Sequence, residues 1–409
     1  MTNPLIQKSR LKDYFFNFLN SYNKETQSNL DWEEFYQISF NTSRNKKTSE
    51  VLDIYSSFLS SEDKFISDNI LIVDSLFEII QKLSDNSFII ADRTAIDFIK
   101  TCYNFSINKR YICFIDEIGS GKDLESIIKI INKTKFLHLL AIGGGRTLDF
   151  AKFISLKGNK KLMSIPSSLA THVYASPKIH VLPPIKELGY SKTINGESSH
   201  LSLIDSTVLN VLFQKNKRLI LSGFGDLMAF INAKHDWIQS SNKCKERYSI
   251  IVDESIDFIV SKLQTIDINK PLKNWIEDYI FFQCLLCNIT HWIGSAPASG
   301  AEHLFAKCIE DNSLESPIHG EVVALGVMIF SYIRNKDVEI VQDLFKKFNI
   351  SNSFSDLNLN KNQIIDALNK SLMEGNNKNR DTILNNLDIS YNFFENVINE
   401  MINKKLLME

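Results

Sequence analysis

Charge of one sign is not in excess in this sequence, which has 46 lysines and arginines against 48 aspartates and glutamates and a net charge of −2. This balance gives no electrostatic basis for binding nucleic acid or an anionic membrane, so any site for an anion must be local. Glycine and proline are also scarce, with 15 and 8 residues, which excludes collagen-like and low-complexity chains. With 44% hydrophobic residues, the 409-residue chain has the composition of a globular protein, and its length favours two domains.

Long apolar runs and a signal-peptide pattern are absent as well. Residues 1–8 lack the charged-then-apolar order of a signal peptide. The longest apolar stretch, at 279–289, is too short to span a bilayer and contains Gln283 and Asn288. We therefore expect no membrane insertion, no nucleic-acid partner and a cytoplasmic location.

Cysteine is sparse, with six residues scattered through the chain, and this favours reduced thiols over a disulfide framework. Cys284 and Cys287 have the spacing of metal and redox sites, but they lie in an apolar helical run. No second pair exists to complete a site of four thiolates. We interpret both residues as part of a packed core.

The most informative stretch that is present lies at 137–152, where an apolar run is followed by three glycines and then by helical spacing. Glycines without side chains let backbone N–H groups approach a ligand closely, and a helix dipole favours negative charge at its first turn. Gly143, Gly144 and Gly145 therefore predict a cradle for an anion. A tight turn without a ligand would have the same local pattern.

Strand-like apolar runs alternate with helical patterns through the first half of the chain, which predicts a parallel sheet covered by helices. The predicted strands outside the glycine motif are 70–73, 88–92, 111–116, 161–166, 178–181 and 201–204. From Ser206 on the pattern is almost wholly helical. We predict a helical extension at 1–65, a Rossmann-like α/β domain at 66–205 and an all-helical domain at 206–409, with a cleft between the two domains.

Two further features could carry chemistry. The strand at 161–166 ends in a hydroxyl-rich loop, and because ligands of such sheets bind beyond the carboxyl ends of strands, this loop and the glycine turn should face one crevice. His172 closes that loop, while His303 and His319 each lie beside a glutamate and near a glycine, as metal ligands can. Sequence spacing alone cannot show whether histidines from three separate loops lie close together in the fold.

Several motifs carry a resemblance to a known superfamily. Residues 143–152 (GGGRTLDFAK) resemble the GGG-x-x-x-D-x-A-K signature of the iron-containing alcohol dehydrogenase and dehydroquinate synthase superfamily. Three later segments resemble its sn-glycerol-1-phosphate dehydrogenase branch: PSSLATHVYASP at 166–177, SGFGDL with KHDW at 222–237, and APASGAEH with HGE at 296–321. The resemblance runs in the correct order from residue 66 to residue 350.

The resemblance implies a nicotinamide cofactor. The glycine turn and Thr147 would hold the pyrophosphate, and Asp92 would accept from the adenosine ribose, which favours NAD over NADP without excluding NADP. Asp149 matches a carboxylate that contacts substrate in related glycerol dehydrogenases. The implied cofactor-binding residues are Asp92, Gly143, Gly144, Gly145, Thr147, Ser167, Ser168 and Thr171.

The resemblance also implies a catalytic metal, usually zinc, held by an aspartate and two histidines, which point to His303 and His319. By counting from Pro166, the aspartate position falls on His172. We therefore predict a zinc site of His172, His303 and His319, with another divalent metal as the alternative, because three imidazoles and one open position also form a catalytic zinc site. In the alternative interpretation His172 only fills space and the metal is weakly bound or absent.

Two other departures from the branch concern the substrate. Ala296 stands where the branch has an arginine, the usual fork for a phosphate, and Lys307 stands where a histidine is frequent. A nearby lysine could replace the arginine, but the sequence does not show which one.

The implied activity is reduction of the ketone of a small polyol or sugar phosphate, with dihydroxyacetone phosphate to sn-glycerol 1-phosphate as the leading case. The implied catalytic residues are Asp149, His172, His303 and His319. A synthase that returns its hydride to the substrate, like dehydroquinate synthase, and a non-catalytic nucleotide-binding relative are the alternatives. The implied partner is a small phosphorylated substrate, and assembly into a homo-oligomer stays open.

Overall fold

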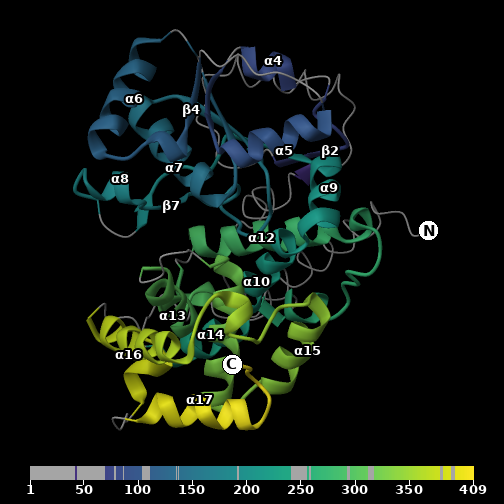
Figure 1. The fold of residues 1–409 in the computed structure, drawn as a ribbon, viewed down its shortest axis with the longest axis vertical. Coiled ribbons are helices and arrows are strands. Elements are labelled where there is room, and N and C mark those ends of the chain that lie inside the picture. The colour runs from purple at the N-terminus through teal and green to yellow at the C-terminus, as the bar shows by residue number, and fades with distance from the viewer. Residues whose placement is uncertain are drawn as a thin grey trace, which may run out of the picture.

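The computed structural model describes most of the chain beyond residue 70. The described residues are 42–43, 70–77, 80–85, 87–103, 111–134, 136, 138–190, 193–240, 256–257, 259–292, 295–311, 317–377, 381–387 and 392–409. Within them, an α/β half and a helical half lie one above the other (Figure 1).

The α/β half is built on a sheet whose described strands all run parallel, in the order β1-β2-β9-β6-β5-β3-β4. The strands are β1 (Thr42–Ser43), β2 (Ile70–Val73), β3 (Phe88–Ala91), β4 (Ile112–Phe114), β5 (His138–Gly143), β6 (Lys161–Pro166) and β9 (Leu201–Asp205). The predicted parallel sheet is confirmed. The run predicted at 178–181 forms β7 (Lys178–His180), which pairs with β8 (Thr193–Asn195) in a separate antiparallel hairpin.

Both faces of the sheet are covered, as the apolar runs require. In β5, Leu139 and Ala141 belong to the hydrophobic core on one face, and Leu140 and Ile142 to the core on the other. The helices α6 (Gly121–Lys133) and α7 (Gly145–Gly158) pack on the first face. The helices α4 (Ile80–Asp85) and α5 (Arg93–Tyr103) pack on the second.

The named elements from Ser206 on are helices and short 3-10 turns, as the helical pattern predicts. They are α9 (Ser206–Asn216), α10 (Arg218–Gln239), α12 (Ile276–Trp292), α13 (Ala301–Glu310), α14 (His319–Arg334), α15 (Val338–Phe348), α16 (Lys361–Asn377) and α17 (Phe393–Asn403), with the 3-10 turn η4 at Ala296–Ala298. Helix α10 is buried on almost all sides and packs along α14, so these two helices form the centre of this half (Figure 1).

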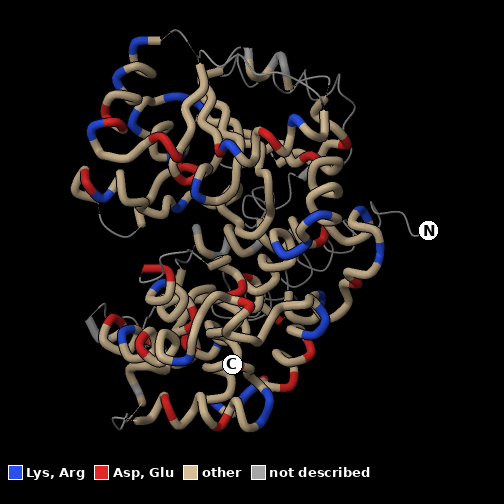
Figure 2. The backbone as a smooth tube through the Cα atoms, viewed as in Figure 1, with Lys and Arg blue, Asp and Glu red and all other residues tan. Residues whose placement is uncertain are grey.

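The predicted helical extension at 1–65 lies outside the described residues except for β1, which adds a short strand beside β2. The extension therefore stays a prediction, and Thr42–Ser43, its only described residues, pair with the edge of the sheet. Acidic and basic residues alternate over both halves (Figure 2). None of the described helices combines the length and the apolar character that a bilayer crossing requires.

The described cysteines are all free thiols. Cys284 and Cys287 are buried in α12, as predicted for core residues. Burial raises the pKa of Cys284 to about 12, so its thiol stays protonated and is a poor metal ligand.

Candidate active site

The glycine turn joins β5 directly to α7, as predicted. Gly144 is the N-cap of α7, and no side chain caps the helix there. A Cβ atom on Gly143 would come within 2.5 Å of Thr147 Oγ1, so the turn needs glycine at 143 for packing. A Cβ on Gly144 would instead meet only Ser168 Oγ, at 3.7 Å. The uncapped helix end and the open space at Gly144 fit a cradle for an anion.

Other predicted cofactor residues gather around this turn. The backbone N–H of Asp92 donates to the carbonyl of Ile142 at 3.0 Å, and that of Ser167 donates to Gly143 at 3.0 Å. A Cβ on Gly145 would lie 2.8 Å from Thr171 Oγ1. The structure therefore brings the end of β3, the glycine turn and the hydroxyl loop together at the carboxyl edge of the sheet.

Two of these residues also have structural roles that the sequence did not indicate. Asp92 Oδ1 accepts from the backbone N–H of Ala95 at 3.0 Å and caps α5. Thr147 is only 1% exposed, and its side chain fills the inside of the glycine turn. Their contacts with a cofactor stay predictions.

The helical half brings α10 and α14 unusually close together through glycines. A Cβ on Gly225 would lie 2.0 Å from the carbonyl oxygen of Gly320, and one on Gly320 would lie 1.9 Å from that of Ser222. No larger residue fits at this crossing. Because Asp226 follows Gly225 and His319 precedes Gly320, the close crossing places these two side chains beside each other.

Asp226, His303 and His319 form a group whose ligand atoms all lie within 4.8 Å of one another. Nε2 of His303 lies 3.2 Å from Asp226 Oδ1, and Nε2 of His319 lies 3.7 Å from the same oxygen. The three side chains come from three helices, α10, α13 and α14. One carboxylate and two imidazoles with converging atoms fit a catalytic zinc site or a non-haem iron site.

Further carboxylates fix the orientation of both rings. Nδ1 of His303 donates to Glu302 Oε1 at 3.0 Å, and Nδ1 of His319 donates to Glu310 Oε1 at 2.6 Å. Each ring therefore directs its Nε2 toward Asp226. Such carboxylate–histidine pairs accompany metal-bound histidines and make the ligand more basic.

The electrostatics of the group favour bound positive charge. Burial alone would lower the pKa of His303, but its hydrogen bonds with Asp226 and Glu302 raise it to about 9. Burial alone would raise the pKa of Asp226, but the neighbouring His172, together with the two other histidines, holds it well below its usual range. A site that stabilises protons on imidazoles also stabilises a metal cation in their place.

His172 lies beside this group but takes a different position from the one predicted. Its Nδ1 donates to Asp226 Oδ2 at 2.7 Å, so the ring contacts the carboxylate rather than converging with the other two histidines. The carboxylate of the group is Asp226, which was not among the predicted site residues. The signal for it was the SGFGDL motif, in which glycine directly precedes Asp226.

Asp149, predicted to contact substrate, is 5% exposed on α7. Its Oδ1 lies 2.9 Å from Nζ of Lys152, whose side chain is fully buried. Lys152 also donates to the carbonyl of Ser176 at 3.1 Å and to that of Val173 at 3.3 Å. In this structure the pair holds the segment after the hydroxyl loop, and a contact of Asp149 with substrate stays a prediction.

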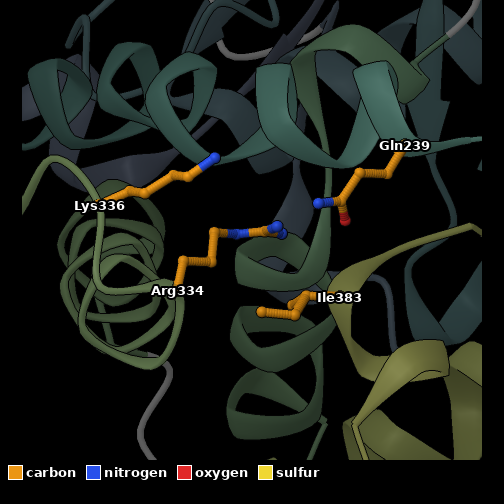
Figure 3. A pocket seen from close by; sticks show the side chains of 4 residues that line it. All are labelled: Gln239, Arg334, Lys336 and Ile383. Atoms are coloured by element: carbon orange, nitrogen blue, oxygen red, sulfur yellow. The ribbon is translucent and has the colours of Figure 1, made fainter.

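A cavity of about 340 Å³ lies elsewhere in the helical half, lined by Gln239, Arg334, Lys336 and Ile383 (Figure 3). Gln239 and Arg334 are the last residues of α10 and α14. Asp226 and His319 lie about 20 Å earlier along the same helices at 1.5 Å per residue. The Arg334 guanidinium already donates to Asp236, so we assign no catalytic role to this cavity.

Three comparisons relate the chain to known proteins. The family model described as iron-containing alcohol dehydrogenase matches residues 75–193. Glycerol-1-phosphate dehydrogenase [NAD(P)+] of Saccharolobus islandicus is 28% identical over 272 residues, which are 65% of this chain and 74% of that protein.

Solved structures share the fold. A probable glycerol dehydrogenase from Sinorhizobium meliloti aligns with a TM-score of 0.55 at 13% identity, covering 88% of this chain and 95% of the other. Sulfoacetaldehyde reductase from Bifidobacterium kashiwanohense, solved in complex with NAD+, aligns with a TM-score of 0.53 at 13% identity, covering 83% and 98%. The resemblance predicted from the motifs is confirmed: the chain is similar to glycerol-1-phosphate dehydrogenases and to the iron-containing alcohol dehydrogenase family model.

Proposed function

We propose that this protein is a metal-dependent, NAD(P)-linked oxidoreductase that reduces the ketone of a small polyol or sugar phosphate. The leading case is dihydroxyacetone phosphate to sn-glycerol 1-phosphate. The observation that carries the proposal is the group of Asp226, His303 and His319, which His172 links directly to the loop beside the glycine turn. The name of the similar Saccharolobus enzyme supports the same substrate class.

The metal would be held by Asp226, His303 and His319, and zinc is the ion we propose because one carboxylate and two imidazoles leave a position open. When bound, such an ion polarises the oxygen of a carbonyl or alkoxide. Glu302 and Glu310 keep the Nε2 atoms of the two rings directed inward. In this proposal His172 is not a ligand, and its hydrogen bond positions the carboxylate of Asp226.

The cofactor would lie along the carboxyl edge of the sheet. Backbone N–H groups at the start of α7 are available for the pyrophosphate, because no side chain caps that helix. Ser167, Ser168 and Thr171 would line the cofactor on the side of the hydroxyl loop, and Asp92 would accept from the adenosine ribose. A carboxylate there repels a 2′-phosphate, so NAD is the proposed preference.

The cellular location follows from the same proposal. The free thiols among the described cysteines fit the reducing cytoplasm, where small phosphorylated metabolites are also found. We propose a cytoplasmic enzyme with a small phosphorylated substrate as its partner.

The test follows NADH absorbance with dihydroxyacetone phosphate and then with a panel of sugar phosphates, each with and without zinc. Net oxidation of NADH that requires the metal supports the proposal. Formation of product without net oxidation would instead indicate a synthase that returns its hydride. Absence of both, from protein shown to bind NAD and zinc, would overturn the proposed activity.

A further inference from the structure

A strip of partly exposed residues runs along α13 and includes a lysine without an assigned role. Within this helix only His303, Lys307 and Glu310 are partly exposed, while every other residue is buried. Steps of four and three residues place them on one face of the helix. His303 contacts Asp226, and Glu310 contacts His319, so both ends of the strip border the proposed metal site. Lys307 therefore lies on the same strip, between two residues that touch that site.

The strip faces the α/β half. Burial lowers the pKa of His180 at the end of β7, and the charges of Asp149, Glu310, His319 and Lys307 are near enough to act on it as well. Just beyond the strip, Asp311 lies 4.0 Å from Nζ of Lys186 on α8 (Pro183–Lys186). Figure 1 shows β7 and α8 at the edge of the α/β half that is nearest to α13. Lys307 and His180 thus approach the same region from opposite halves.

Among the residues that the structure describes, none forms a hydrogen bond or an ion pair with the side chain of Lys307. Lys152 and Lys186, in contrast, both lie near carboxylates. A lysine in the last turn of a helix gains some stabilisation from the helix dipole, of about 0.3–1 kcal/mol. That small effect alone does not explain why a lysine stands on the only partly exposed face of α13.

The charges around the proposed metal site indicate a function for the positive charge of Lys307. Asp226, Glu302 and Glu310 are three carboxylates, and a divalent ion balances two of them. A phosphate monoester that approached this site would then meet net negative charge, so its binding requires a further cation nearby. Position 296, where the related branch has an arginine, is alanine and cannot supply that cation.

We propose that Lys307, with His180 opposite, forms the subsite that binds the phosphate group of the substrate and so replaces the missing arginine. This inference rests on the proposed function, whose phosphorylated substrate it places. Lysine binds a phosphate as a compact point charge, and an imidazole N–H can add one donor. Lys307 is then a specificity-determining residue that selects phosphorylated over unphosphorylated ketones.

The experiment uses the zinc-loaded enzyme with NAD and two kinds of measurement. The first is calorimetric titration with inorganic phosphate, which needs no turnover. The second compares KM and kcat for dihydroxyacetone phosphate with those for unphosphorylated dihydroxyacetone. Lys307→Met removes the charge and nearly keeps the volume, and Lys307→Arg keeps the charge. Lys186→Met is the matched control, since it removes a lysine from the same edge of the α/β half.

Loss of one charged contact should weaken phosphate binding about tenfold to a hundredfold in Lys307→Met. KM for dihydroxyacetone phosphate should rise by a similar factor, with KM for dihydroxyacetone and both kcat values nearly unchanged. Lys307→Arg should retain most of the binding, and Lys186→Met all of it. Thermal melting of each variant establishes that it is folded.

Equal phosphate binding by folded Lys307→Met and by the parent protein would overturn the subsite, as would absence of phosphate binding to the parent. Failure of the proposed function has a different signature. In that case phosphate binding would still depend on Lys307, but neither ketone would oxidise NADH.

Discussion

Nδ1 of His172 lies 2.7 Å from Oδ2 of Asp226, and this hydrogen bond joins the loop after β6 to helix α10 of the other half. Asp226 is 2% exposed, so its carboxylate has little water to stabilise its charge. Its other oxygen, Oδ1, is the atom on which His303 and His319 converge. His172 therefore connects the half that carries the glycine turn to the carboxylate of the proposed metal site.

The first prediction separates a metal ligand from a positioning residue. Asp226→Asn should lose stoichiometric zinc, because the amide removes the only carboxylate of the group. His172→Asn should keep one zinc per chain but bind it about tenfold to a hundredfold more weakly, the usual effect of losing a partner of a ligand. Competition with a chromophoric chelator measures both effects.

A matched control for His172→Asn is available on α10, the helix that carries Asp226. His235 pairs with Asp337 at 2.7 Å, the same distance as His172 with Asp226. His235→Asn should leave zinc affinity unchanged. Complete loss of zinc in folded His172→Asn would return His172 to the ligand set.

The second prediction concerns the ring of His303. His303→Ala should abolish zinc binding and turnover, because it removes one of the two imidazoles and leaves Asp226 with one fewer partner. NAD binding should be unaffected, since the glycine turn lies in the α/β half. Metal analysis and fluorescence titration with NADH measure the two properties on the same sample. A His303→Ala protein that remains active would refute the proposed metal group.

The elements that the sequence predicted well are those determined locally. The glycine turn at Gly143–Gly145 follows a buried strand and opens a helix, and all three signals lie within one short stretch. The strands of the parallel sheet are continuous apolar runs, because both faces of such a sheet are buried. Neither inference depends on knowing what packs against the segment.

The metal ligands could not all be predicted from the sequence, because their positions depend on how the helices cross. Asp226 lies in the middle of α10, and only the close approach at Gly225 and Gly320 brings it beside His319. Glu310 similarly contacts His319 from another helix, nine positions away in sequence. Helical periodicity does not reveal such contacts. The resemblance assigned the carboxylate ligand to a position in the hydroxyl loop, and in this chain that position is His172.

A third prediction tests the cofactor cradle. Gly144→Val should raise the dissociation constant of NAD about tenfold or more, because a branched side chain fills the space beside the helix end. Melting should change little, since a Cβ at Gly144 meets only Ser168 Oγ at 3.7 Å. Gly143→Ala is the contrasting variant. Its Cβ would clash with Thr147 at 2.5 Å, so it should lower the melting temperature. Unchanged NAD affinity in Gly144→Val would place the cofactor elsewhere.

The pH dependence of the metal-free protein gives a fourth prediction. The pKa of His303 rises from 6.5 to about 9 on folding, so the folded state binds a proton more tightly than the unfolded chain. The resulting stabilisation is fully present below pH 6.5 and is lost as the pH rises through about 9. Urea unfolding in the presence of a chelator should show stability falling across this window.

Two comparisons make the pH prediction specific. His303→Asn should flatten the pH dependence, because it removes the titrating ring. Zinc-loaded protein should lack the fall, since a bound cation takes the place of the proton on the ring. A metal-free protein whose stability rises between these pH values would contradict the assigned hydrogen bonds of His303.

The last prediction concerns the buried ion pair of Lys152 and Asp149. Lys152 is 2% exposed, and its Nζ lies 2.9 Å from Asp149. Lys152→Met should lower the free energy of unfolding by about 3–5 kcal/mol, because it leaves a buried carboxylate without its cation and removes the donor to the backbone carbonyls of Val173, Ser176 and Lys178. Asp149→Asn combined with Lys152→Met should recover part of that loss, since the unpaired charge is gone. As a control, Lys234→Met removes a more exposed partner of Asp257 and should cost about 1 kcal/mol or less. Equal costs for the two lysine variants in urea unfolding would show that the buried pair contributes no more than a surface one.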